Sequence, residues 1–267
     1  MADESVVGSL VSLWRYPVKS MMGEELNSTK VTENGLLGDR AYALVDAETG
    51  KIISAKLPRK WGILFDCRAA LNLPSQVKIT LPDGASIMGD AADINRVLSQ
   101  TFGREVKLET FAPETPSIEM YTPDIEGLSD SDAETNALIR PNTFFDAATV
   151  HLLTTATLNQ LQSLTPTSRF ETRRFRPNLV IQPAKDATGF VENQWVGKTL
   201  AIGNEVRIEI TEPCPRCVMT TMPQGELPRD IEILHAAVKH NGGHIGIYAN
   251  VLQGGTIRRG DAVAIVV

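Results

Sequence analysis

The chain has 267 residues, of which 42% are hydrophobic and 22% are charged, and its formal net charge is −6. This composition is typical of one or two soluble globular domains with an ample core, and it excludes a disordered or fibrous chain. The acidic balance argues against a nucleic-acid partner, because nucleic-acid phosphates require a basic surface.

The sequence carries no membrane or export signal. No apolar run approaches the roughly 20 residues that span a bilayer, and the opening residues 1–5 lack the basic region of a signal peptide. We therefore expect a cytoplasmic protein without a membrane partner. Three cysteines cannot all pair, and a reducing compartment would keep them as thiols available for catalysis or metal binding.

The first half of the chain predicts a β-rich domain with one helix. The alternating runs 40–45 and 51–55 flank a turn that contains glycine, which predicts a strand pair, and 76–81 is a further alternating run. Between residues 92 and 102 the apolar positions recur at helical spacing, and Gly103 supplies a stop. A small barrel or sheet with one helix follows from this pattern.

An acidic segment from 111 to 142 lacks clear periodicity, and we expect it to be a loop or domain connection centred on 129–134. The second half alternates strands and helices. Strands are expected at 149–153, 178–181, 206–210, 246–251 and 262–267, and helices at 158–164 and 230–240. Two β-rich domains with a few helices are the simplest interpretation of the whole pattern.

Two cysteines form the motif Cys214-Pro-Arg-Cys217 just after the alternating run. The thiolate is the nucleophilic and metal-binding form of cysteine, and the adjacent Arg216 favours it electrostatically. A thioredoxin-like redox couple and half of a zinc site remain alternatives. The redox couple usually begins a helix, whereas 218–221 is expected to be a strand. Structural zinc needs four ligands, and no second paired ligand motif is visible.

The other candidate ligands have simpler interpretations. Cys67 follows the apolar residues 63–65, and we expect it to be a small buried hydrophobe. The four histidines show no metal-ligand pairing, and we expect surface or loop positions for His151, His235, His240 and His244.

Several segments of the chain resemble the MOSC family, named for molybdenum cofactor sulfurase C-terminal domains. Residues 13–20 (LWRYPVKS) and 35–40 (GLLGDR) resemble the β-barrel domain that precedes MOSC domains, and 174–178, 213–221 and 255–261 resemble the MOSC domain itself. The resemblance implies a mainly β fold with some α. It implies an N-terminal β-barrel-like domain at 1–120 and a C-terminal MOSC β-barrel domain with peripheral helices at 121–267.

The resemblance also implies a molybdopterin-type molybdenum cofactor, with Cys217 as both the metal ligand and the catalytic residue. A soft dithiolene ligand set accepts one further protein thiolate, and the phosphate of the pterin requires cationic and amide donors. Cys214 is expected to have a structural or auxiliary role. The positions that bind the cofactor in relatives correspond here to Lys19, Ser20, Arg40, Thr154, Thr155, Arg176, Asn178 and Arg216.

The family includes the mitochondrial amidoxime reducing component and bacterial relatives that reduce N-hydroxylated compounds. The resemblance implies a molybdenum-dependent oxidoreductase that reduces the N–O bond of a small N-hydroxylated substrate, with the cofactor supplying the chemistry. An iron–sulfur cluster needs four cysteine ligands, and we expect none in this chain. A separate flavin reductase, ferredoxin or cytochrome would therefore supply the electrons, docking near the cofactor cleft.

One motif departs from the family pattern. Amidoxime reducers follow the two threonines with a hydrophobic residue, an aspartate and a proline, whereas Thr221 is followed here by Met222-Pro-Gln. The missing aspartate leaves the substrate and the partner open. An alternative function is a sulfur carrier or delivery module in which Cys217 holds a persulfide, and such a carrier needs no tightly bound metal.

Overall fold

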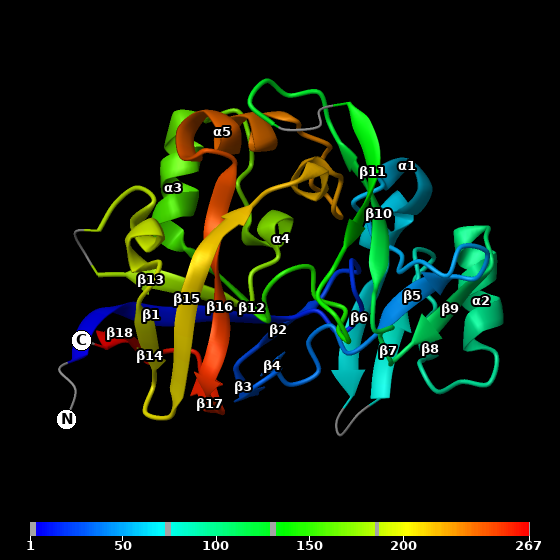
Figure 1. Cartoon of the computed structure of the whole chain (residues 1–267), viewed down its shortest axis with the longest axis horizontal. Coiled ribbons are helices and arrows are strands. Elements are labelled where there is room, and N and C mark those ends of the chain that lie inside the picture. Colours follow the sequence, from blue (N-terminus) through cyan, green and yellow to red (C-terminus); the bar gives the residue numbers. More distant parts are fainter. Residues whose placement is uncertain (1–3, 73–75, 129–131, 185–186, 267) are drawn as a thin grey trace.

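A computed structural model describes residues 4–72, 76–128, 132–184 and 187–266. It contains a closed barrel of seven strands, which lies at the left of Figure 1. Around the barrel the strands are β13 (Leu179–Pro183), β12 (Val150–Thr154), β16 (His244–Gln253), β15 (Val206–Pro215), β14 (Thr199–Ile202), β18 (Ala262–Val266) and β1 (Glu4–Arg15). Pairing of β1 with β13 closes the ring, and only β12 and β13 run parallel. The barrel therefore joins the first strand of the chain to six strands from its second half.

The barrel forms because its strands alternate apolar and polar residues. In β15, Val206, Ile208 and Ile210 are buried, whereas Arg207 and Glu209 between them are not. Side chains two positions apart point to the same face of a strand, so one face of β15 fills the barrel interior. The short strand β2 (Glu24–Leu26) pairs with β1 outside the closed ring.

A three-stranded sheet of β3 (Ser28–Thr32), β4 (Gly35–Leu36) and β17 (Gly255–Arg258) packs on the barrel, because its Val31, Leu36 and Ile257 belong to the barrel core. The part of the molecule at the right of Figure 1 consists of small sheets around a separate core. They are β5 (Ala43–Asp46) with β9 (Val106–Glu109); β6 (Arg68–Asn72) with β7 (Gln76–Thr80) and β8 (Ser86–Met88); and β10 (Ser117–Thr122) with β11 (Ala133–Leu138). Trp61, Leu64 and Leu98 are buried in this core, and so is Cys67, which confirms its expected place as a small hydrophobe.

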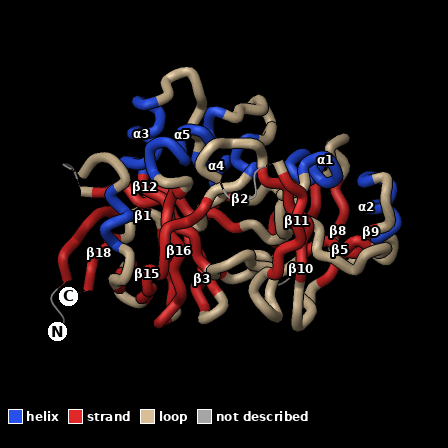
Figure 2. Tube along the Cα trace, turned by 45° about the horizontal axis from the view of Figure 1, so that its top comes forward, coloured by secondary structure: helices blue, strands red, loops and turns tan. Residues whose placement is uncertain are grey.

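Helices cover one end of the barrel and the edge of the small sheets, as Figure 2 shows in blue. The α-helices are α1 (Pro58–Trp61), α2 (Ile94–Phe102), α3 (Thr155–Leu164), α4 (Thr172–Phe175) and α5 (Glu232–Asn241), and the 3-10 helices are η1 (Gly62–Asp66), η2 (Val191–Trp195) and η3 (Val218–Thr221). Gly103 ends α2 in the left-handed conformation, as its position predicts. None of the described helices has both the length and the apolar character needed to cross a membrane.

The expected mainly β fold with some helices is confirmed, but two local predictions are wrong. The segment 111–142 is not a plain connection, because β10 and β11 form a hairpin there; residues 129–131 between them lie outside the described part of the chain, as does Val267 at its end. Most residues of this hairpin are only half-buried, so the hydrophobic alternation that signals a strand is weak.

The expected pairing of 51–55 with 40–45 is present as a short antiparallel contact. Val45 and Ile52 form a bridge, the N–H of Asp46 donates to the carbonyl of Lys51 at 3.0 Å, and the N–H of Ile53 donates to the carbonyl of Leu44 at 2.8 Å. The longer partner of β5 is β9. The second wrong prediction concerns 218–221, which is the 3-10 helix η3 and not a strand. The division of the chain at residue 120 stays a prediction, although β1 lies in the same barrel as the C-terminal strands.

Candidate functional site

A cavity of about 70 Å³ lies where the barrel meets the small sheets, and we call it the cationic cavity. Five of the expected cofactor-binding residues line it together: Lys19, Ser20, Arg40, Arg176 and Asn178. They come from three separate places in the sequence: 19–20, 40 and 176–178. Only the packing of the two halves against each other brings them to one point.

Three of these residues adopt a left-handed backbone conformation, with φ of 66° at Ser20, 48° at Arg40 and 55° at Arg176. Among the described residues other than glycine, only Asp132 and Asn142 also have positive φ. The conformation costs an L-amino acid about 1–2 kcal/mol, so the surrounding structure must enforce it. Backbone strain of this kind clusters at functional sites, and here it lies at the wall of one cavity.

The ring of Tyr16 holds two of the guanidinium groups. The Cζ atom of Arg40 lies 4.6 Å from the ring centroid and that of Arg176 lies 4.2 Å from it, both within the range of cation–π contacts. Arg176 donates from Nη1 to the carbonyl of Met21 at 2.7 Å, whereas its buried Nη2 has no hydrogen-bond partner among the described residues. Burial, together with the nearby Arg40, lowers the pKa of Arg176 to about 10, and it remains a cation at neutral pH. Its Nη2 is thus a donor available to a ligand.

Asp39 and Asn178 fix the position of Arg40. Oδ2 of Asp39 accepts hydrogen bonds from Arg40 Nη1 at 2.5 Å and from Asn178 Nδ2 at 2.9 Å, and Oδ1 accepts from the backbone N–H of Tyr16 at 2.7 Å. The amide oxygen of Asn178 in turn accepts from the backbone N–H of His151 at 3.1 Å. Asn178 therefore organises the cavity wall through bonds within the protein.

Asp146 bridges two lysines at the cavity. Its carboxylate lies 2.5 Å from Lys19 Nζ and 3.0 Å from Lys56 Nζ. Burial raises the pKa of Asp146, but the two ammonium groups outweigh this effect and hold the pKa well below its usual range. Burial also lowers the pKa of Lys19, and Asp146 opposes that shift. The sequence analysis identified neither Asp146 nor Lys56, since neither belongs to a recognisable motif.

The Cys-Pro-Arg-Cys motif lies beside the cavity. Cys217 is half-buried and directly precedes η3, whose Met219 lines the cavity. Arg216 donates from Nη2 to the carbonyl of Phe175 at 2.8 Å and from Nη1 to Sγ of the buried Cys214, while its buried Nε has no partner among the described residues. Burial raises the pKa of Cys214 although Arg216 opposes it, which favours the thiol form of Cys214.

His151 and Tyr248 are cavity residues that the sequence analysis missed. The expectation of a surface or loop histidine is wrong for His151, because β12 carries it into the interior next to the cavity. Its Nε2 lies 3.5 Å from Arg216 Nη1, and its ring meets that of Tyr248 edge-on at 5.9 Å. Burial and Arg216 hold the pKa of His151 well below its usual value, so the imidazole is neutral at pH 7. All five residues of β12 are buried, so the apolar neighbours Val150, Leu152 and Leu153 were the available signal for this burial.

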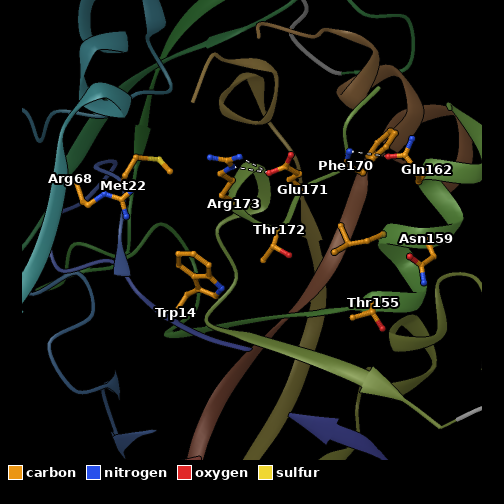
Figure 3. A pocket seen from close by; sticks show the side chains of 11 residues that line it. Trp14, Met22, Arg68, Thr155, Asn159, Gln162, Phe170, Glu171, Thr172 and Arg173 are labelled. Carbon is orange, nitrogen blue, oxygen red and sulfur yellow. Dashed lines mark hydrogen bonds and ion pairs between the residues drawn. The ribbon is translucent and has the colours of Figure 1, made fainter. Parts of the chain in front are cut away.

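Two expected cofactor residues lie apart from the cavity. Thr154 is buried, caps α3 by accepting from the N–H of Thr157, and donates its hydroxyl to Glu192 at 2.6 Å. Thr155 lines a different cleft of about 550 Å³, shown in Figure 3 beside Trp14, and donates to Gln182 at 3.0 Å. Both hydroxyls therefore have partners elsewhere in this conformation.

The charge of the cavity suits an anionic group that carries a soft metal. Three cations line it, Lys19, Arg40 and Arg176, against one carboxylate, Asp146. Behind this lining, Lys56 pairs with Asp146, Arg216 lies 3.5 Å from His151, and Asp39 pairs with Arg40. Two buried guanidinium N–H groups without partners match the acceptor oxygens of a phosphate. Among the described residues, no group of three His, Cys, Asp or Glu side chains comes close enough to hold a metal. The charge and the unpartnered N–H groups thus fit an anionic group such as a phosphate.

Comparisons with known proteins match both halves of the chain. Residues 7–113 match the MOSC N-terminal beta barrel domain and residues 140–264 match the MOSC domain. The chain is 24% identical over 297 residues to mitochondrial amidoxime reducing component 2 of Rattus norvegicus, covering 96% of this chain and 83% of the relative. For the same protein of Bos taurus the identity is 25% over 293 residues, with 96% and 83% covered.

The chain was also compared with solved structures. The YuaD protein from Bacillus subtilis superposes with a TM-score of 0.48 at 11% sequence identity, covering 99% of this chain and 98% of that one. The two family models together account for most of the chain, in the order that its motifs predict. The protein therefore belongs to the MOSC domain family and carries the N-terminal β-barrel domain of that family.

Proposed function

We propose that this protein binds a molybdopterin-type cofactor in the cationic cavity and reduces the N–O bond of small N-hydroxylated compounds. The observation that carries the proposal is the pair of buried, unpartnered N–H groups on Arg176 and Arg216, at a cavity rich in cations and next to the half-buried thiol of Cys217. The similarity to amidoxime reducing components supports the reaction class.

Each residue has a role in binding the cofactor. Lys19, Arg40 and Arg176 would hold the phosphate, because lysine supplies a compact charge and arginine a planar pair of donors. Ser20 holds the backbone in place, since its hydroxyl accepts the N–H of Ala55 at 3.1 Å. Cys217 would supply the single protein thiolate to the metal. Arg216 has an unpartnered Nε that can donate to the cofactor.

When bound, the cofactor supplies two-electron reduction at its metal. The reaction balances as R–N–OH with two electrons and two protons giving R–N–H and water. A separate protein would provide the electrons, and a flavin reductase, a ferredoxin or a cytochrome each fits that requirement. The cytoplasmic location expected from the sequence stays a prediction, and the named relatives are mitochondrial.

The test is the molybdenum content of protein expressed with an intact cofactor pathway, measured by elemental mass spectrometry for wild type and Cys217→Ser. We expect about one metal per chain in the wild type, reduction of benzamidoxime with a chemical reductant, and loss of both in the variant. Cys67→Ala is the control, since Cys67 is buried and is not among the residues that line the cavity, and it should keep the metal. A wild type that lacks molybdenum under these conditions would exclude the proposal.

The sulfur-carrier alternative makes the opposite prediction. A thiolate that accepts sulfane sulfur must be reachable, and Cys217 is half-buried whereas Cys67 and Cys214 are buried. A persulfide on Cys217 in metal-free wild-type protein, detected by mass spectrometry after incubation with a sulfur donor, would favour this alternative.

A further inference from the structure

The 3-10 helix η3 takes part in two cavities. Its Met219 lines the cationic cavity, whereas Val218 lines a second cleft of about 460 Å³, together with Met222, the residue that follows η3. Cys217, the residue before η3, is adjacent in the chain to Val218 and two positions before Met219, although it is not among the residues that line either space. We call the second space the η3 cleft.

Lys56 connects the same two spaces from the N-terminal half. Its ammonium pairs with Asp146 in the cationic cavity, and its backbone carbonyl accepts the N–H of Tyr121, a residue that lines the η3 cleft, at 2.7 Å. Lys56 also interacts electrostatically with Cys217. Moreover, Tyr121, Met222 and Cys217 all pack against one hydrophobic core. Two independent segments thus place the η3 cleft next to the cysteine.

The lining of the η3 cleft favours an uncharged ligand with a flat apolar part. Its walls include the ring of Tyr121 and the apolar side chains of Pro58, Val218 and Met222. Its charged residues balance, with two arginines, Arg59 and Arg229, and two carboxylates, Asp132 and Glu134. Arg59 pairs with Glu134, and the Tyr121 hydroxyl donates to Asp132 at 3.2 Å. The volume lies in the range of small-molecule sites, about 300–1,000 Å³.

We propose that the η3 cleft binds the N-hydroxylated substrate as a neutral molecule, with its apolar body against Tyr121 and Met222 and its N–OH end toward Cys217. This inference rests on the proposed function and adds the place and the charge class of the substrate. Amidoximes and oximes with an apolar body suit such a cleft because they are uncharged at neutral pH. The cationic cavity, in contrast, suits an anion.

The experiment fills one cleft at a time. Met222→Trp places a bulky ring in the η3 cleft, and Asn159→Trp places the same ring in the cleft of Figure 3, where Asn159 is exposed on α3. Tyr121→Ala is a second η3-cleft variant that removes a wall without crowding it. Binding of benzamidoxime to the full chain is measured by ligand-observed NMR, which needs no turnover, and KM is measured on molybdenum-loaded enzyme with a chemical reductant.

We expect Met222→Trp and Tyr121→Ala to raise both Kd and KM for benzamidoxime about tenfold, because a few lost apolar contacts change affinity by this order. Hydroxylamine has no apolar body, so its KM should stay within about twofold of wild type. Asn159→Trp should leave all of these values unchanged.

The proposal is overturned if benzamidoxime binds both η3-cleft variants as tightly as it binds wild type, or if only Asn159→Trp weakens it. The two proposals fail separately. If the η3-cleft variants turn over substrate and their Kd is unchanged, the proposal for this cleft is excluded and the proposed reductase function stands. If binding depends on Met222 and Tyr121 but fully loaded enzyme shows no turnover, the proposed reductase function is excluded and the proposal for the cleft stands.

Discussion

Asn178 donates a hydrogen bond from Nδ2 to Oδ2 of Asp39 at 2.9 Å, although the two residues are 139 positions apart in the sequence. The bond ties the start of β13 to the turn that carries Arg40. It is one of the contacts by which the two halves of the molecule share a single cavity wall.

Replacing Asn178 with alanine should lower the free energy of unfolding by about 2–3 kcal/mol, because the buried carboxylate of Asp39 and the backbone N–H of His151 each lose a partner. Urea denaturation at pH 7 measures the change. Asn159→Ala, on the exposed face of α3, should stay within about 0.5 kcal/mol of wild type. Equal losses in both variants would show that the bond to Asp39 contributes nothing.

The left-handed backbone of Arg40 predicts a difference between two small replacements. Arg40→Gly and Arg40→Ala both remove the guanidinium. A φ of 48° at this position is unfavourable in conformational energy for alanine but not for glycine. The glycine variant should therefore be more stable by about 1 kcal/mol in thermal or urea unfolding. At Arg68, in the strand β6, the order should reverse, since glycine weakens an ordinary strand. An Arg40→Ala variant as stable as Arg40→Gly would contradict the enforced strain.

Cofactor retention should depend on the guanidinium geometry of Arg176. Arg176→Lys keeps the charge but loses the planar pair of donors, one of which is buried without a partner. We expect about tenfold weaker cofactor retention, measured as molybdenum per chain after dilution and dialysis. Arg258→Ala, at an exposed position of β17, should retain the wild-type content. Unchanged retention in Arg176→Lys would place the phosphate elsewhere.

Stability toward acid should depend on Asp146. Its pKa is held below the unfolded value of about 3.9, so an unfolded chain binds more protons as the pH falls toward that value. The stabilisation is complete above about pH 5 and is lost as the pH drops further. Asp146→Asn should therefore lose less unfolding free energy between pH 6 and pH 3 than wild type.

Wild type and Asp146→Asn should differ by about 1–2 kcal/mol in the unfolding free energy that they lose between pH 6 and pH 3. The difference is this small because the Asp146 side chain is 33% exposed and water screens part of its attraction to Lys19 and Lys56. Urea unfolding at a series of pH values measures it. Asp66→Asn, an exposed replacement of the same kind, should keep the wild-type slope. Identical slopes for wild type and Asp146→Asn would show that the pair with the lysines does not stabilise the fold.

Much of the fold and part of the site follow from local sequence patterns. The alternation in β15 predicts a half-buried strand, and the apolar residues before Cys67 predict its burial. Lys19, Arg40 and Arg176 were identified by the resemblance to the MOSC family and not by a local pattern, and the structure places them together. Such patterns succeed because the side-chain period of a strand or helix is a local property of the chain.

What the sequence by itself determined is therefore the type of most elements and the chemistry of the motif residues. Only the tertiary structure decided that β1 closes the barrel against β13, that Thr154 turns to Glu192, and that Lys56 and Asp146 complete the cavity. Contacts between distant segments depend on which strands pair and in which register, and a one-residue shift exchanges the two faces of a strand. No local pattern encodes that choice, so the cavity emerges only when the two halves pack.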